Sequence, residues 1–410
     1  METHSYRLGL VLAATLLSSA AFAEDLVIYQ DWSSPAEVKA LNVLKAAAAK
    51  KGINWIDITI PHDTGSNVTL LNLVTGGNPP NVFSENNPEV YRDLEKMGLG
   101  RTMTDLFKDV GAMDHFPAVV KKVITIDGEA RKIPLGIHVD GMVYYNKEVA
   151  AKAGIDPETW ASLDAMFADF DKVKAAGFIP LAIGAQQWQI GYLTHALVAT
   201  LGGPDYFTEI YGAEPKAEAL DSAVLRDTFT WLRKFQQVAD PGSVNRDWNM
   251  TTNTVISGQA LMQIHGDWMK GEWRAAGKDF GCAQIPGAKA VVVSVDSWGL
   301  LGGQPAAKDK AELDFASVVV DPVVNADFAA AKGATPIRAD APTDKLDVCS
   351  HGVLDILKDP ARQVQNPHSM VDPDWQASIW EVAFNFWSTP SMTVDEAIAN
   401  MKSNYETIVR

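Results

Sequence analysis

Five tryptophans with polar neighbours suggest binding of a ligand that carries many hydroxyl groups. Each lies beside Asp, Asn, Gln or Ser in a segment without helical periodicity; they are Trp32, Trp188, Trp248, Trp268 and Trp298. An indole face packs against the C–H patches of a pyranose, while carboxylates and amides hydrogen-bond its hydroxyls. Any one of these rings could instead cap the hydrophobic core. Trp160 and Trp231 fall on predicted helices, where we expect core positions.

The sequence lacks the patterns of common catalytic and metal centres. Its 8 histidines are scattered without an HExxH or Cys-x-x-Cys motif, which disfavours a zinc site, and GxSxG, P-loop and EF-hand patterns are also missing. Paired carboxylates for glycoside hydrolysis stay an alternative, because 51 Asp and Glu residues guarantee some close pairs. We therefore expect a binding protein without metal or cofactor, with a periplasmic glycoside-acting enzyme as the alternative.

Composition and charge narrow the class of protein. Apolar residues make up 47% and charged residues 21% of the chain, as in ordinary globular proteins. The net charge of −16 repels nucleic acid and anionic lipid, so neither is an expected partner. A chain of 410 residues exceeds what one hydrophobic core usually serves, which predicts two lobes.

The first 23 residues have the pattern of a secretory signal peptide. Arg7 precedes an apolar run from Leu8 to Leu17, and small residues follow as far as Ala23, after which we expect cleavage. The run is shorter than the roughly 20 apolar residues that span a bilayer. The mature protein is therefore expected in the periplasm, where Cys282 and Cys349 would form a disulfide; two buried thiols are the alternative.

Alternating strand and helix signals predict an α/β fold. No GxGxxG follows the first predicted strand, which disfavours a dinucleotide site. The expected strands lie at 25–30, 53–60, 81–83, 131–136, 142–146, 179–183, 260–264 and 290–295. The expected helices lie at 36–50, 67–74, 160–176, 221–238 and about 253–257, with further helices from 311 and in the tail from 349.

We expect each lobe to hold a mostly parallel sheet flanked by helices. The sequence shows no low-complexity linker, so the lobes should be joined by several crossover segments. Residues 24–136 with about 288–345 are assigned to the first lobe. Residues from about 137 to 287 with 346–410 are assigned to the second.

Eight sequence segments resemble one family of binding proteins. They are WSSPAE (32–37), GNPPN (77–81), KIPLGIHVDGMVYYN (132–146), NRDWN (245–249), MQIHGDWMKG (262–271), CAQIPG (282–287), VDS (295–297) and KGATPIR (332–338). In this order they are similar to the glucose-binding branch of the extracellular solute-binding proteins, family 1, of sugar ABC importers. The resemblance implies two lobes that close on a small carbohydrate or polyol, no catalysis, and importer permease subunits as partners. We expect a monomer.

The resemblance also implies which residues bind ligand. The family's aromatic, acidic, stacking and basic positions match Trp32, Glu37, Trp268, Asp296 and Lys332. His138 and Trp188 fall in family landmarks at the crossover and in the second lobe. Four further residues have expected structural roles: loop orientation for Asp267, an ion pair or cap for Arg338, and turns for Gly266 and Gly333.

Departures from the glucose branch affect specificity. Asp31 replaces the first of two adjacent tryptophans, and Ser84 and Asn86 stand where a glutamine and a lysine are usual. Ser294 replaces an asparagine, and Asp372 replaces a histidine. Because each unmatched buried polar group costs about 1–3 kcal/mol, these changes predict a guest other than glucose. An alditol, a longer saccharide or an amino sugar are the candidates.

Overall fold

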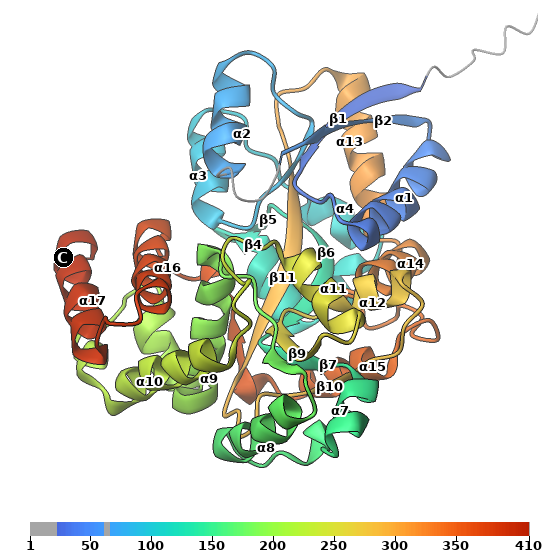
Figure 1. The fold of residues 1–410 in the computed structure, drawn as a ribbon. Coiled ribbons are helices and arrows are strands. Elements are labelled where there is room, and N and C mark those ends of the chain that lie inside the picture. Colours follow the sequence, from blue (N-terminus) through green and yellow to red (C-terminus); the bar gives the residue numbers. More distant parts are fainter. Residues whose placement is uncertain (1–22, 61–65, 410) are drawn as a thin grey trace, which may run out of the picture.

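The computed structural model describes residues 23–60 and 66–409 (Figure 1). The predicted signal peptide at 1–23 therefore lies almost wholly outside the described residues. Within the described part of the chain, no helix is both long and apolar enough to cross a membrane.

A six-stranded sheet forms the larger of the two main sheets. Five of its strands follow the order β12-β11-β3-β1-β2. The sixth strand, β6, is outside this order and pairs with β11. β1 runs parallel to β2 and β3, whereas β11 is antiparallel to β3 and β6. The strands are β1 (Glu24–Gln30), β2 (Ile53–Thr59), β3 (Val82–Ser84), β6 (Ile133–Asp140), β11 (Val291–Leu300) and β12 (Gln363–Gln365).

Helices cover the β1–β3 part of this sheet and form with it the first lobe. Figure 1 shows α1 and α13 beside β1 and β2, with α2 and α3 on the other side. These helices are α1 (Pro35–Ala49), α2 (Ser66–Thr75), α3 (Pro88–Lys96), α4 (Thr104–Asp109), α5 (Ala112–His115), α6 (Ala118–Ile124), α13 (Ala306–Val319) and α14 (Pro322–Lys332). A hairpin of β4 (Thr125–Ile126) and β5 (Glu129–Ala130) follows α6.

A four-stranded sheet in the order β10-β7-β9-β8 forms the second lobe with its helices. Its strands are β7 (Met142–Tyr145), β8 (Ile179–Leu181), β9 (Ala260–His265) and β10 (Gly281–Ala283). The predicted two-lobe α/β fold is confirmed, but this sheet is mostly antiparallel instead of mostly parallel. Both β10 and β9 run against β7, and only β8 is parallel to β9. These directions depend on which distant strands pair with β7, and local sequence patterns do not show that pairing.

Most of the second lobe is helical. Its helices are α7 (Lys147–Ala153), α8 (Leu163–Ala175), α9 (Gln187–Tyr211), α10 (Ala223–Val238), α11 (Trp248–Ile256), α12 (Met269–Ala275), α15 (Val348–Ile356), α16 (Pro373–Ser388) and α17 (Val394–Ile408). Short 3-10 helices lie at Pro157–Thr159, Ala217–Asp221, Pro360–Arg362 and Pro367–Ser369. The predicted helix at 160–176 begins later, at Leu163, because the Ser162 side chain caps it by accepting the amide of Ala165.

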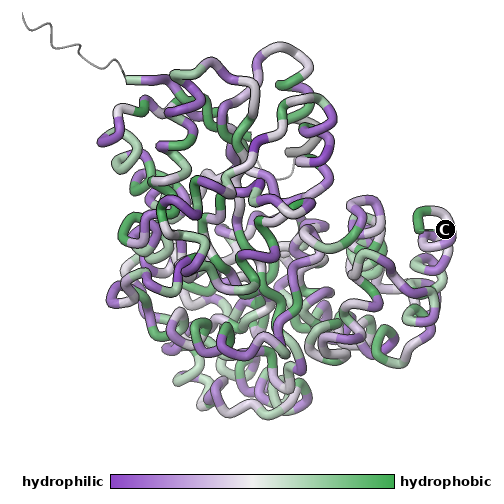
Figure 2. Tube along the Cα trace, turned by 180° about the vertical axis from the view of Figure 1, so that it is seen from behind, coloured by the Kyte–Doolittle hydropathy of each residue, from purple (hydrophilic) through white to green (hydrophobic). Residues whose placement is uncertain are grey.

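Strands β6 and β11 connect the two lobes. Along β6, Ile133, Leu135 and Ile137 belong to the first-lobe core, whereas Val139 packs with the second-lobe core residues Met142 and Tyr144. Figure 1 shows β11 passing through the middle of the molecule between the lobes. Figure 2 shows hydrophobic segments running through the interior of the molecule. We call β6 and β11 the crossover strands. Both extend further along the chain than the strands predicted at 131–136 and 290–295.

The predicted disulfide between Cys282 on β10 and Cys349 on α15 is confirmed. The two cysteines are 67 residues apart, so the bond closes a long loop in the unfolded chain. It fixes α15 to the edge of the smaller sheet.

Replacing both cysteines by serine should lower the free energy of unfolding by about 4 kcal/mol, because the unfolded chain regains the entropy of the open loop. Urea unfolding of the oxidised wild type and the double variant measures this difference. If both cysteines of the non-reduced wild type reacted with an alkylating reagent, the disulfide would be disproved.

Candidate functional site

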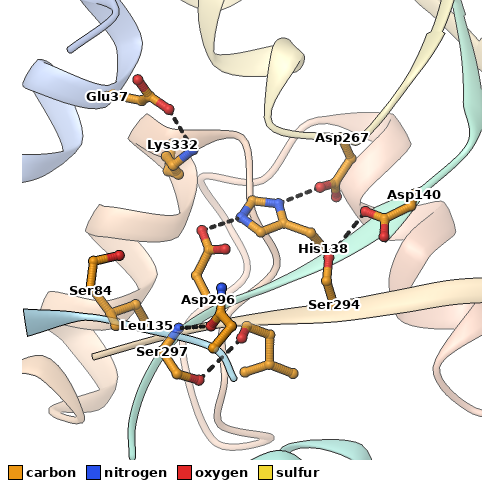
Figure 3. A network of polar contacts seen from close by, with 12 residues as sticks. Glu37, Ser84, Leu135, His138, Asp140, Asp267, Ser294, Asp296, Ser297 and Lys332 are labelled. Carbon is orange, nitrogen blue, oxygen red and sulfur yellow. Dashed lines mark hydrogen bonds and ion pairs between the residues drawn. The ribbon is translucent and has the colours of Figure 1, made fainter. Parts of the chain in front are cut away.

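A buried histidine joins the two crossover strands to the second lobe. His138 lies on β6, and its Nδ1 and Nε2 lie 2.5 Å from Asp267 Oδ1 and 3.1 Å from Asp296 Oδ2. Figure 3 shows the imidazole between the two carboxylates, with Asp296 coming from β11. Because ionised carboxylates only accept hydrogen bonds, both ring nitrogens are donors and the ring is an imidazolium.

The charge state of His138 follows from these neighbours. Burial alone would lower the pKa of His138, but the charges of Asp296 and Asp267 outweigh it and raise the pKa to about 9. His138 has no exposed surface. It therefore lies behind the site and orients Asp296, and its predicted contact with a ligand stays a prediction.

Asp267 extends the network into the second lobe. Its other carboxylate oxygen accepts a hydrogen bond from Lys270 on α12 at 3.2 Å, and Lys270 also donates to Ser350 Oγ at 2.8 Å. Ser350 follows the disulfide residue Cys349 on α15. Asp267 is fully buried and holds the loop between β9 and α12, which is the orienting role considered from the sequence.

Three of the predicted ligand-binding residues, Lys332, Glu37 and Trp32, lie together in the first lobe. Lys332 Nζ donates to Glu37 Oε1 at 3.2 Å (Figure 3). It also lies 4.8 Å from the centre of the Trp32 ring. Burial opposes the charge on Lys332, but Glu37 and Asp296 raise the pKa of the lysine overall. Glu37 also accepts the backbone amides of Ser33 and Ser34 in a capping box at the start of α1.

Trp32 leaves little surface for a ligand. It is 8% exposed and packs against Trp298 and Phe328 in the first-lobe core. Trp298 itself stacks on Phe315, so for this residue the core alternative holds. Ligand contacts by Trp32, Glu37 and Lys332 stay predictions.

Three of the polar residues that depart from the glucose branch, Asp31, Ser84 and Ser294, form hydrogen bonds with other polar side chains. Ser84 Oγ donates to Asp31 Oδ1 at 3.3 Å in the first lobe. On the crossover strands, Ser294 Oγ donates to Asp140 Oδ1 at 3.0 Å (Figure 3). Burial raises the pKa of Asp140 to about 7. Asp31, Ser84, Ser294 and Asp296 are all partly exposed, and 24% of the Asp296 side chain is accessible.

Other residues singled out in the sequence have structural contacts. Asn86 Oδ1 accepts the backbone amide of Ser297 at 3.1 Å. Asp372 is exposed and caps α16 by accepting the amides of Asp374 and Trp375, so its ligand contact stays a prediction. Arg338 forms the expected ion pair, with Asp340 at 2.7 Å. Gly333 ends α14 with a φ of 86°, a left-handed conformation that suits glycine.

Aromatic rings gather beside this network. Trp268 contacts His138 edge-on, with ring centres 5.4 Å apart, and also packs against His265 and Tyr192. Trp188 and Trp248 also contact His265. Sequence reasoning missed Tyr192 and His265. Tyr192 follows Trp188 by four residues, a spacing that places both rings on one face of α9 and could have identified it.

The described residues hold no group of three or more His, Cys, Asp or Glu side chains arranged to bind a metal ion. The arrangement instead offers a partly exposed carboxylate beside half-buried indoles. Such a set can accept hydroxyl hydrogen bonds and stack on C–H surfaces.

Replacing His138 by Gln should destabilise the protein most at low pH. The pKa of His138 in the folded state, about 9, exceeds its ordinary 6.5. The stability that its protonation contributes is therefore fully present below 6.5, and it is lost as the pH rises through 9. This contribution to the free energy of unfolding is on the order of 3 kcal/mol.

The measurement is the difference in urea unfolding free energy between wild type and His138→Gln across this range. A difference is needed because buried Lys132, whose pKa burial lowers to about 8, gives the opposite trend in both proteins. The control is His351→Gln, the same substitution at an exposed histidine. A difference that does not vary with pH contradicts the assigned charge state.

Solved structures share this fold. The model is similar to a chitin oligosaccharide binding protein with a TM-score of 0.80 and 17% identity, over 94% of this chain and 98% of that one. It is also similar to a bacterial solute receptor described as preferring β-D-galactopyranose exclusively, with a TM-score of 0.79 and 17% identity, over 95% and 100% of the two chains.

Relatives at the sequence level cover most of the chain. A probable sugar-binding periplasmic protein of Mesorhizobium japonicum is 32% identical over 362 residues, which are 86% of this chain and 85% of that protein. A protein of the same description from Brucella suis is 31% identical over 84% of this chain and 82% of its own. The family model described as bacterial extracellular solute-binding protein matches residues 18–348. This chain therefore belongs to the family of bacterial extracellular solute-binding proteins.

Proposed function

We propose that this protein is the periplasmic sugar-binding component of an ABC importer. Its ligand would be a mono- or small oligosaccharide or a related polyol or sugar derivative. The observation that carries the proposal is the half-buried Trp268 beside the partly exposed Asp296, where the crossover strands join the lobes. The names of the similar periplasmic proteins support a sugar as ligand.

In this proposal the two lobes close around the ligand by bending at the crossover strands. Trp268 stacks on the sugar ring, and Asp296 accepts hydrogen bonds from its hydroxyls. The closed form would then dock on permease subunits. The proposed lobe boundaries remain 24–136 with about 288–345 for the first lobe and about 137–287 with 346–410 for the second. We further propose a monomer that is exported by its N-terminal signal peptide.

The glycoside-acting alternative is less well supported by the geometry. Hydrolysis needs two carboxyl groups that both reach the glycosidic bond. The two carboxylates joined through His138 do not meet this need, because Asp267 is fully buried and engaged by Lys270. Recovery of an unchanged ligand bound at one per protein supports binding. Cleavage of a glycoside with turnover would refute it.

Replacing Trp268 by Ala should weaken sugar binding at least about tenfold, since a stacking face is lost. Titration calorimetry with a sugar that binds the wild type measures the effect. Trp231→Ala is the matched control, because Trp231 is also half-buried but packs against Phe167 and Lys234 on the helices of the second lobe. Unchanged affinity in a folded Trp268→Ala protein would remove Trp268 from the site.

A further inference from the structure

Four half-buried aromatic side chains form a continuous surface in the second lobe. They are Trp188, Tyr192, Trp248 and Trp268. The three indoles contact the buried ring of His265, and Tyr192 contacts Trp188 and Trp268. We call these five residues the aromatic wall. Half-buried indoles in one group are unusual for a surface exposed only to water, because each exposes apolar area.

Three separate parts of the chain build the aromatic wall. Trp188 and Tyr192 lie one turn apart at the start of α9, so both rings point from the same helix face. Trp248 is the first residue of α11, which begins where Asp247 caps the helix. His265 ends β9, and Trp268 follows in the turn before α12.

The rings contact one another without a gap. From His265 the ring centres of Trp268, Trp188 and Trp248 lie 4.9, 5.3 and 6.0 Å away. Tyr192 contacts Trp188 at 5.6 Å and Trp268 at 5.7 Å. Burial and the charge of Lys332 lower the pKa of His265 to about 3, so its ring is neutral at physiological pH.

This continuity shows what kind of surface the wall is. Two rings that grip a single sugar from opposite sides would be held apart by the thickness of that sugar. Here the indoles pack on a shared ring, so they form one side of a site and not its two sides. A pyranose that stacks on Trp268 leaves Trp248 and Trp188 for other parts of the ligand.

The wall adjoins the proposed sugar site. Its Trp268 end contacts His138, which bonds Asp296. The Tyr192 phenol lies close enough to Asp140, Asp296 and the first-lobe Asp31 that their charges add to burial in raising its pKa. In the first lobe, by contrast, Lys332 and core rings cover Trp32. The extended stacking surface therefore belongs to the second lobe.

We infer that the ligand is an oligosaccharide of at least two pyranose rings, with one ring on Trp268 beside Asp296 and the next on Trp248. This inference rests on the proposed function and narrows its substrate class, which includes single sugars and polyols, to a chain of at least two sugars. Trp248 then sets the preference for length, because its ring contacts His265, which Trp268 also contacts.

The test is titration calorimetry of the mature protein with sugars of increasing length. The probes are glucose, maltose and maltotriose; glucose, cellobiose and cellotriose; N-acetylglucosamine and its β1,4-linked dimer and trimer; and galactose with raffinose. In at least one series we expect the Kd to fall at least about tenfold from the single sugar to a longer member.

Substitutions test whether the aromatic wall causes the tighter binding of the longer sugar. Trp248→Ala should raise the Kd of the longer sugar at least about tenfold and that of the single sugar less than about twofold. Trp268→Ala should raise both, and Trp231→Ala neither. Circular dichroism confirms that each variant is folded, and Trp248→Phe, which keeps a ring, should restore most of the affinity for the longer sugar.

Two results would overturn the inference while leaving the proposed function intact. One is a single sugar that binds as tightly as every longer member of its series. The other is an unchanged Kd for the longer sugar in folded Trp248→Ala protein. If no carbohydrate of any length bound to the folded wild type, the proposed function would fail, and the inference with it.

Discussion

The imidazolium of His138 between Asp267 and Asp296 is the contact on which the centre of this molecule depends. Its ring sits on one crossover strand, bonds a carboxylate of the other, and bonds a second carboxylate in the loop that carries Trp268. All of these groups lie at or near the interior, where an unpaired charge is costly. Removing any one member takes a charged partner away from a buried group, so the three residues must be placed together.

This contact also links the second lobe to the crossover strands. Asp267 accepts a hydrogen bond from Lys270 on α12, and Lys270 also donates to Ser350 on α15. The disulfide joins α15 to β10. The loop from β9 to α12 is therefore fixed at both ends. Trp268 lies in this loop, so its ring is presented on a rigid support, which suits a stacking surface.

Much of the fold could be predicted from the sequence, because the local signals agree with the structure. The first strand and helix, the capped start of α1 at Ser34 and the disulfide all follow from local patterns or from compartment chemistry. The strand directions of the smaller sheet could not be predicted, since they depend on which distant strands pair.

The residues of the candidate site could be predicted from the sequence, but which of them are exposed could not. The motifs led to His138, Trp32 and Trp268, yet only the packing of distant segments shows that the first two are buried and the third is not. Trp32 is covered because α14 returns late in the chain and brings Lys332 and Phe328 over it. Tyr192 and His265 were missed because an aromatic cluster assembled from α9, α11 and β9 has no signature within any one segment.

The protonation state of His138 can be observed most directly by nitrogen NMR of protein labelled in its histidine rings. The account predicts that both ring nitrogens of His138 carry protons at neutral pH and that one is lost only near pH 9, where burial and its two carboxylates place its pKa. A single protonated nitrogen at neutral pH would contradict it. The two crossover strands would then be joined by a neutral ring, and Asp267 and Asp296 would lack the charge that holds them.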